Sequence, residues 1–102
     1  MSSHSTYKIT FSQAALEDIK SIENYTYREW GKRQGDIYHN LLCEAFNTIE
    51  KQPQLGRPRK GISRKFKCYN VGKHVIVYTL TQQDIFVVRV LHGKMHFSQQ
   101  LA

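Results

Sequence analysis

The sequence predicts a small single domain of the α+β class, in the order strand, helix, helix, strand, strand, strand. Three observations predict it: apolar and polar residues alternate near the amino terminus, two helical periodicities meet at Gly31, and three strand-like stretches close the chain. The helices are expected to form an antiparallel hairpin on one face of a three-stranded antiparallel sheet. All 102 residues are assigned to this domain, with residues 1–6 and 98–102 as flexible ends.

The first expected strand covers residues 7–11, because alternation with period two is typical of a half-buried strand. Ser12 follows as a helix N-cap, since its hydroxyl can accept a hydrogen bond from a backbone N–H of the first turn. The first helix ends at Gly31, which is expected in the left-handed conformation that closes many helices. Its inward positions recur at three- and four-residue steps: Leu16, Ile19, Ile22, Thr26 and Trp30.

The second helix covers residues 34–51 and ends before Pro53, which disfavours helix at the residue preceding it. Tyr25, Tyr27 and Trp30 are interpreted as aromatic packing within the hairpin rather than as a ligand cage. The second helix carries a broad apolar stripe: Ile37, Tyr38, Leu41, Leu42, Ala45, Phe46 and Ile49.

Three further strands are expected at residues 65–69, 74–81 and 85–92. The first of them alternates, whereas the other two are apolar at nearly every position and are expected in the buried middle of the sheet. Residues 70–73 and 82–84 are short enough to be hairpin turns. The loop at residues 54–63 is marked by Gly56, Pro58 and Gly61.

Charge is unevenly divided between the two halves of the chain. Residues 1–50 carry five Lys and Arg against seven acids, a net charge of −2, whereas residues 51–102 carry ten against the single acid Asp84, a net charge of +9. A surface that only needs to be soluble normally interleaves both signs. The asymmetry therefore predicts a positive face that attracts an acidic partner or nucleic acid.

The two cysteines, Cys43 and Cys68, do not make a disulfide framework, and both are expected as free thiols packed like small hydrophobic side chains. The longest apolar runs, residues 75–78 and 85–88, are far shorter than a membrane span. The polar residues 1–6 do not resemble a signal peptide. We therefore expect a cytoplasmic protein without membrane contact.

A resemblance to a known family rests on residues spread over nearly the whole chain. Its two most specific parts are the sequence RVLH at residues 89–92 and GRPR at residues 56–59. With the remaining matches, the chain resembles the ParE-type toxins of the RelE/ParE superfamily. Those matches are Tyr7, Ile9, Phe11, Ser12, Ala15, Asp18, Ile19, Ile22, Tyr25, Trp30, Gly31, Tyr38, Leu41, Ile49, Pro53, Leu55 and residues 74–78.

The resemblance implies the toxin of a bacterial type II toxin–antitoxin system. A cognate antitoxin, ParD-like or similar, would hold it silent in a hetero-oligomer through an acidic segment that folds onto the toxin. The ParE branch is associated with inhibition of DNA gyrase by binding, so no enzymatic activity, cofactor or metal is expected. The RelE branch instead cleaves messenger RNA on the ribosome.

A ribonuclease would need a base, an acid and cations near one phosphate. The residues that offer these are Arg64, Lys65, Arg89, His92 and His96. The RelE branch usually has a tyrosine near its carboxyl terminus, but none follows His92, and residues 85–102 contain no acid to serve as a base. The residues therefore favour binding, with the endoribonuclease as the alternative.

Two interaction surfaces are expected. The end of the last strand and its tail would bind the target through Arg89, His92, Lys94, Met95, His96 and Phe97. Two of these have structural alternatives, since Arg89 could pair across the sheet and His92 could be a satisfied strand-end histidine. An amphipathic antitoxin helix along the hairpin, with a strand or second helix on the basic sheet, would contact Leu16, Ile19, Tyr27, Trp30, Tyr38, Arg57, Arg59, Lys65 and Lys67.

Two rival interpretations rest on single features. His92 and His96 have a zinc-ligand spacing, but two histidines without a further ligand fall short of a site. Residues 57–73 contain seven Lys and Arg, with Phe66 and Tyr69 between them, which would suit a phosphate groove with base stacking. No helix-turn-helix or zinc-finger pattern accompanies this segment, so a non-enzymatic nucleic-acid-binding module is the other alternative.

Overall fold

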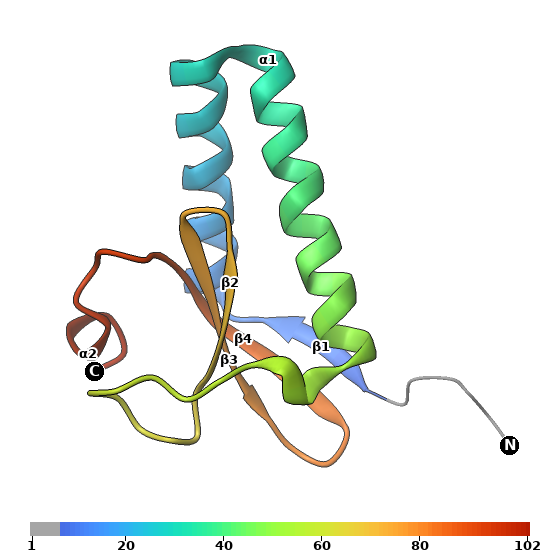
Figure 1. Ribbon diagram of the computed structural model, residues 1–102, viewed down its shortest axis with the longest axis vertical. Helices are drawn as coiled ribbons and strands as arrows, with labels where there is room; N and C mark the ends of the chain where they lie inside the picture. The colour runs from blue at the N-terminus through green and yellow to red at the C-terminus, as the bar shows by residue number, and fades with distance from the viewer. Residues whose placement is uncertain (1–6) are drawn as a thin grey trace, which may run out of the picture.

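The computed structural model describes residues 7–102, and the expected flexible end 1–6 lies outside the described residues. The α+β class and the order of the predicted elements are confirmed (Figure 1). Two short helices, η1 and α2, are additions that periodicity did not predict. The elements are β1 (Lys8–Phe11), α1 (Gln13–Lys51), the 3-10 helix η1 (Pro53–Leu55), β2 (Lys67–Val71), β3 (His74–Leu80), β4 (Asp84–His92) and α2 (Phe97–Gln100).

The helical hairpin is formed by α1, which the backbone at Gly31 (φ 87°, ψ 174°) divides into a first arm, residues 13–30, and a second arm, residues 32–51. The arms run antiparallel and side by side, and their closed end projects beyond the strands (Figure 1). Gly31 adopts an extended conformation with positive φ that is nearly exclusive to glycine, rather than the predicted left-handed helical one. The predicted cap is confirmed, since Ser12 Oγ accepts from the Ala15 N–H at 2.9 Å.

The sheet has four strands in the order β1–β4–β3–β2, not the three that were expected. The pairs β2·β3 and β3·β4 are antiparallel as predicted, but β1 lies parallel to β4, from Lys8 opposite Asp84 to Phe11 opposite Val87. Alternation within a strand reveals its buried face but not its partner, so the mixed sheet was not predictable from residues 7–11. Strand β2 also begins at Lys67, two residues later than expected.

Both faces of the sheet are covered. Ile76 and Tyr78 of β3 point into the core beneath the helical hairpin, whereas Val75 and Val77 join a second core on the opposite face. That second core is completed by side chains from the loop before β2 and from the tail. Coverage on both faces explains why β3 and β4 are almost continuously apolar. The second-core partners are Ile62, Phe66, Cys68, Leu91, Phe97 and Leu101.

The carboxyl-terminal tail is anchored by Phe97, which is only 4% exposed and begins α2. The segment 98–102, expected as a flexible end, therefore contains a helical turn that packs on the second core. The two cysteines also differ from each other. Cys68 is half-buried in the second core as expected, but Cys43 is exposed on the hairpin and does not pack as a hydrophobic side chain.

Tyr78 fixes η1 to the sheet. Its buried hydroxyl donates to the Pro53 carbonyl at 2.6 Å and accepts from the Gly56 N–H at 2.9 Å. A Cβ at Gly56 would lie 2.4 Å from the Tyr78 oxygen, so this close approach requires glycine. Burial raises the pKa of Tyr78, which keeps the hydroxyl protonated as a donor. Within residues 7–102, no helix combines the length and apolarity that crossing a membrane requires.

Candidate functional site: a cleft between the hairpin and the ends of β3 and β4

An open cleft of about 660 Å³ lies between the hairpin and the strand ends where β3 begins and β4 ends. Tyr25 and Trp30 of the first arm line it, together with Tyr38 of the second arm and Met95 after β4. Trp30 is 64% exposed and Met95 is 46% exposed. Large apolar side chains left open to solvent around a concavity are typical of a binding surface.

The predicted aromatic packing within the hairpin holds for one of the three aromatic residues. The Tyr27 ring lies against Gly35, where an added Cβ would be 2.4 Å from a ring carbon, and the Tyr27 hydroxyl donates to Asp36 at 2.5 Å. Tyr25 and Trp30 are instead exposed in the cleft. The difference arises because the hairpin projects past the sheet, which leaves the apolar stripe at its tip without a covering layer.

The inner end of the cleft holds Tyr38, His74 and His92. The Tyr38 hydroxyl lies 2.6 Å from His74 Nδ1, and the His74 and His92 rings meet edge to face with their centroids 5.4 Å apart. His92 Nδ1 accepts the Lys94 N–H at 3.1 Å, which leaves the proton of a neutral His92 on Nε2. The tight turn at Gly72, with φ 58°, brings the Tyr38 hydroxyl within 3.2 Å of the Lys73 N–H, which it accepts.

The titration of this cluster follows from burial. Burial lowers the pKa of His74, and the nearby His92 lowers it further, while Asp18 acts in the opposite direction. Burial also raises the pKa of Tyr38, against the hydrogen bond from the Lys73 backbone. Near neutral pH, His74 is therefore neutral and Tyr38 keeps its proton. The cluster offers hydrogen bonds and aromatic edges rather than a phenolate base.

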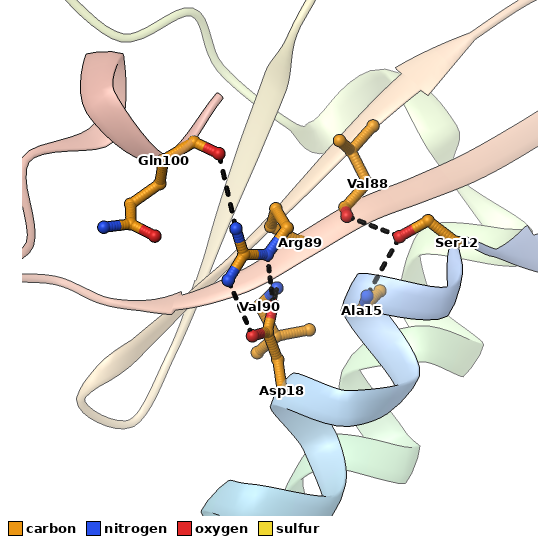
Figure 2. A network of polar contacts seen from close by, with 7 residues as sticks. All are labelled: Ser12, Ala15, Asp18, Val88, Arg89, Val90 and Gln100. Carbon is orange, nitrogen blue, oxygen red and sulfur yellow. Dashed lines mark hydrogen bonds and ion pairs between the residues drawn. The ribbon is translucent and has the colours of Figure 1, made fainter. Parts of the chain in front are cut away.

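Arg89 and Asp18 form an internal clamp (Figure 2). Arg89 Nε donates to Asp18 Oδ2 at 2.7 Å and Nη2 donates to Oδ1 at 2.9 Å, while Oδ2 also accepts the Val90 N–H at 2.9 Å. Arg89 Nη1 donates to the Gln100 carbonyl at 3.3 Å. Strand β1 ends opposite Val87, so Asp18 supplies the acceptor that a neighbouring strand would otherwise give to Val90.

This clamp revises one step of the sequence reasoning. Residues 85–102 contain no acid, but the first arm brings an acid, Asp18, alongside β4. Asp18 accepts three hydrogen bonds from Arg89 and the Val90 N–H, so its carboxylate is engaged within the fold. The sequence signal was present as a carboxylate on the sheet-facing side of the first helix, where an unpaired charge would be costly. Arg89 is thus engaged within the fold, but its partner lies on the first arm of the hairpin and not across the sheet, as the structural alternative had it.

The predicted target-binding residues divide between the cleft, the surface and the core. His92 and Met95 line the cleft, and Lys94 and His96 are exposed in the segment after β4. Phe97 is in the second core, where the Arg59 guanidinium lies 3.8 Å from the ring centroid. Arg59 also donates to the Gly93 carbonyl at 3.2 Å, which ties the basic loop to the tail.

The predicted antitoxin-binding residues fall on two sides of the sheet. Trp30 and Tyr38 line the cleft on the helical side, and Leu16 is exposed on the first arm, whereas Ile19 packs against the core. The basic residues lie in or next to the loop over the second core. Arg57, whose backbone pairs with Cys68, and Lys65 are exposed there, while Arg59 and Lys67 are half-buried.

The nuclease candidates do not converge on one point. Arg64 and Lys65 precede β2, whose residue Lys67 pairs with Tyr78, whereas His92 pairs with His74. Tyr78 and His74 are four residues apart on β3, which is about 13 Å along a strand. Within the described part of the chain, no three His, Cys, Asp or Glu side chains are grouped so that they could hold a metal.

Sequence reasoning missed His74, Lys73 and Tyr25 as cleft residues. One signal for His74 was available. It begins one predicted strand and His92 ends the next, so an antiparallel hairpin of two equally long strands would pair them across the sheet.

Two kinds of comparison relate the chain to known sequences. A family model described as the ParE toxin of the type II toxin–antitoxin system parDE matches residues 9–97. Toxin ParE1 of Mycobacterium tuberculosis (strain ATCC 25618 / H37Rv) is 32% identical over 91 residues, which cover 88% of this chain and 93% of that protein. Toxin ParE3 of Caulobacter vibrioides is 27% identical over 62 residues, 61% of this chain and 62% of that one.

Solved structures share the fold at low sequence identity. A chain of the chromosomal ParDE TA system from P. aeruginosa matches with a TM-score of 0.73 at 10% identity, over 87% of this chain and 98% of that one. A chain of the E. coli DinJ–YafQ complex matches with a TM-score of 0.59 at 16% identity, over 84% and 92%.

Proposed function

The chain belongs to the ParE toxin family of type II toxin–antitoxin systems, and from that premise we propose that it inhibits DNA gyrase by binding it. The observation that carries this proposal is the open, aromatic-lined cleft, in which Trp30 and Met95 are exposed beside His92. Exposed aromatic and methionine side chains around a concavity favour macromolecular contact. In this proposal the target contacts His92, Lys94, Met95 and His96. An inhibitor of gyrase acts in the cytoplasm, because gyrase is located there.

Binding without bond cleavage is supported by how the charged groups near β4 are used. Arg89 and Asp18 neutralise each other in the clamp, with side chains only 22% and 16% exposed. Arg64 and Lys65 lie toward the other end of β2 from His92. A phosphate held at His92 would therefore meet Lys73, which lines the same cleft, but not the cations predicted for cleavage, Arg64, Lys65 and Arg89.

We further propose that a cognate antitoxin neutralises the chain by covering the cleft. The solved structures that share the fold include a chain of a ParDE system and a chain of a DinJ–YafQ complex, which supports a hetero-oligomer here. An amphipathic antitoxin helix along Trp30 and Tyr38 would place its apolar side chains in the cleft. Because Met95 and His92 line the same cleft, such a helix would hide part of the target surface. Acidic residues of the antitoxin would meet the basic loop and raise the association rate.

A gyrase supercoiling assay tests the proposal. The purified chain should inhibit supercoiling or trap cleaved DNA, and the protein encoded by a companion reading frame should relieve the inhibition. His92→Ala and Met95→Ala should weaken inhibition, whereas Lys20→Ala, an exposed change outside the cleft, should not. Supercoiling that proceeds unaffected at saturating concentrations of the chain would refute gyrase as the target.

One observation favours the endoribonuclease as a second candidate. The fold brings Tyr38 and His74 beside His92. A tyrosine and two imidazoles therefore share the cleft, although no tyrosine follows His92 in the sequence. A reconstituted translation reaction separates the two functions. Intact messenger RNA is expected for the gyrase inhibitor, whereas site-specific cuts on ribosomes, lost in His92→Ala, would establish the nuclease.

A further inference from the structure

A cysteine, a histidine and a glutamate form a chain of contacts on the outside of the helical hairpin, away from the cleft. Cys43 Sγ lies 3.5 Å from His39 Nε2, one helical turn away on the second arm. His39 Nδ1 is hydrogen-bonded to Glu23 Oε2 on the first arm. None of the three lines the cleft, and both Cys43 and His39 are open to solvent, with the His39 side chain 50% exposed.

The order of these atoms is that of a nucleophile, a base and a residue that orients the base. When the Nδ1–H group of a neutral His39 donates a hydrogen bond to Glu23, the lone pair on Nε2 faces the Cys43 thiol. The S–H group can then donate to Nε2. If the proton moves onto His39, the Glu23 carboxylate stabilises the imidazolium that forms.

The chain contains its own comparison cysteine. Cys68 is half-buried in the second core, where burial raises the pKa of its thiol against the effect of Arg59. A buried apolar thiol is unreactive by comparison with one that has a base in contact. Asp36, on the same arm and near enough to interact with His39, is itself held by Lys32 and by Tyr27.

We propose that Cys43 is a reactive thiol that exchanges with low-molecular-weight disulfides, with His39 as its base and Glu23 as the positioning residue. Cys43 sulfur attacks one sulfur of the small disulfide while its proton passes to His39 Nε2. The disulfide bond breaks, and the departing thiolate takes the proton from His39. The products are a mixed disulfide on Cys43 and one free thiol, so the small disulfide is the oxidant and no other reactant is needed.

The hairpin places this site where a modification is readily accommodated. Cys43 is on the solvent face of a helix, so an added group would extend into water without displacing the core. The proposal does not depend on the identity of the toxin's target. It requires only that the contact between the two arms holds Glu23 against His39.

Oxidised glutathione is the probe, applied to the full reduced chain, with the rate at each cysteine followed by peptide mass mapping. At pH 7 we expect Cys43 to react at least about tenfold faster than Cys68. His39→Gln should slow Cys43 by about tenfold, below the 10²–10⁴ typical of enclosed general bases because this site is open to water. Glu23→Gln should slow it less, and Glu44→Gln, the same charge change next to Cys43 in sequence, should leave the rate unchanged.

The pH dependence separates a base from a change in accessibility. At pH 10 an ordinary thiol is already ionised, so the wild-type and His39→Gln rates at Cys43 should converge. An unchanged rate in His39→Gln at pH 7, or the same loss at both pH values, would overturn the proposal. The rate at Cys68 reports on folding in every variant, because unfolding would expose that buried thiol.

Discussion

Replacing Asp18 with alanine tests whether the clamp to β4 stabilises the fold. The change removes the acceptor of three hydrogen bonds, two from Arg89 and one from the Val90 N–H. A buried charge or amide left without its partner costs more than the net energy of the bond itself. Taking about 1 kcal/mol for each lost hydrogen bond gives about 3 kcal/mol. Water reaching the partly exposed Arg89 reduces the loss to about 2–3 kcal/mol.

Urea denaturation followed by circular dichroism measures this loss in the free energy of unfolding. In thermal denaturation, the Tm should fall by about 10–20 °C. Asp18→Asn keeps one acceptor oxygen without the charge and should cost less, about 1–2 kcal/mol. Glu17→Ala is the matched control, because this neighbouring acid is exposed and its only described hydrogen bond is from Gln13 at 3.4 Å.

A double-mutant cycle with Arg89→Met identifies the cause of the loss. Asp18→Ala and Arg89→Met should each destabilise the chain, and together they should cost less than their sum by about 1–2 kcal/mol, since both remove the same ion pair. Additive losses, or a loss in Asp18→Ala below about 0.5 kcal/mol, would refute the reasoning that this ion pair secures the edge of β4.

Three further predictions concern the core, the cleft and the antitoxin. Tyr78→Phe should cost about 1–3 kcal/mol in urea denaturation, because the buried Gly56 N–H loses its acceptor, and an unchanged stability would contradict this. His74 has a pKa below its ordinary 6.5, so the unfolded chain binds more protons and stability present above pH 6.5 is lost as the pH falls. His74→Gln should flatten this loss between pH 7 and pH 5, and parallel curves would argue against it. Trp30→Ala should weaken antitoxin binding about tenfold or more in calorimetry, because exposed aromatic residues are frequent hot spots, and it should leave the stability unchanged. Wild-type affinity in this variant would rule out the cleft as the antitoxin-binding surface.

The local elements and the fold class could be predicted from the types of the residues and their order along the chain. Ser12 caps a helix and Gly31 divides the hairpin because capping and positive φ depend on residues within one turn of the position concerned. The apolar runs at residues 74–81 and 85–92 predict buried strands for the same reason. The charge asymmetry and the family resemblance likewise required no knowledge of contacts, since both are properties of residue type and order.

The contacts between residues that are distant in sequence were not predictable in this way and became visible with the arrangement of the elements in space. Asp18 reaches Arg89 because β1 ends opposite Val87 and leaves the β4 edge open to the first arm. The contact of Glu23 with His39 exists because the two arms lie side by side, which sets a register that helical periodicity does not specify. Periodicity reports which face of an element is buried, whereas pairing between elements depends on their crossing, register and direction, which nearby residues do not encode.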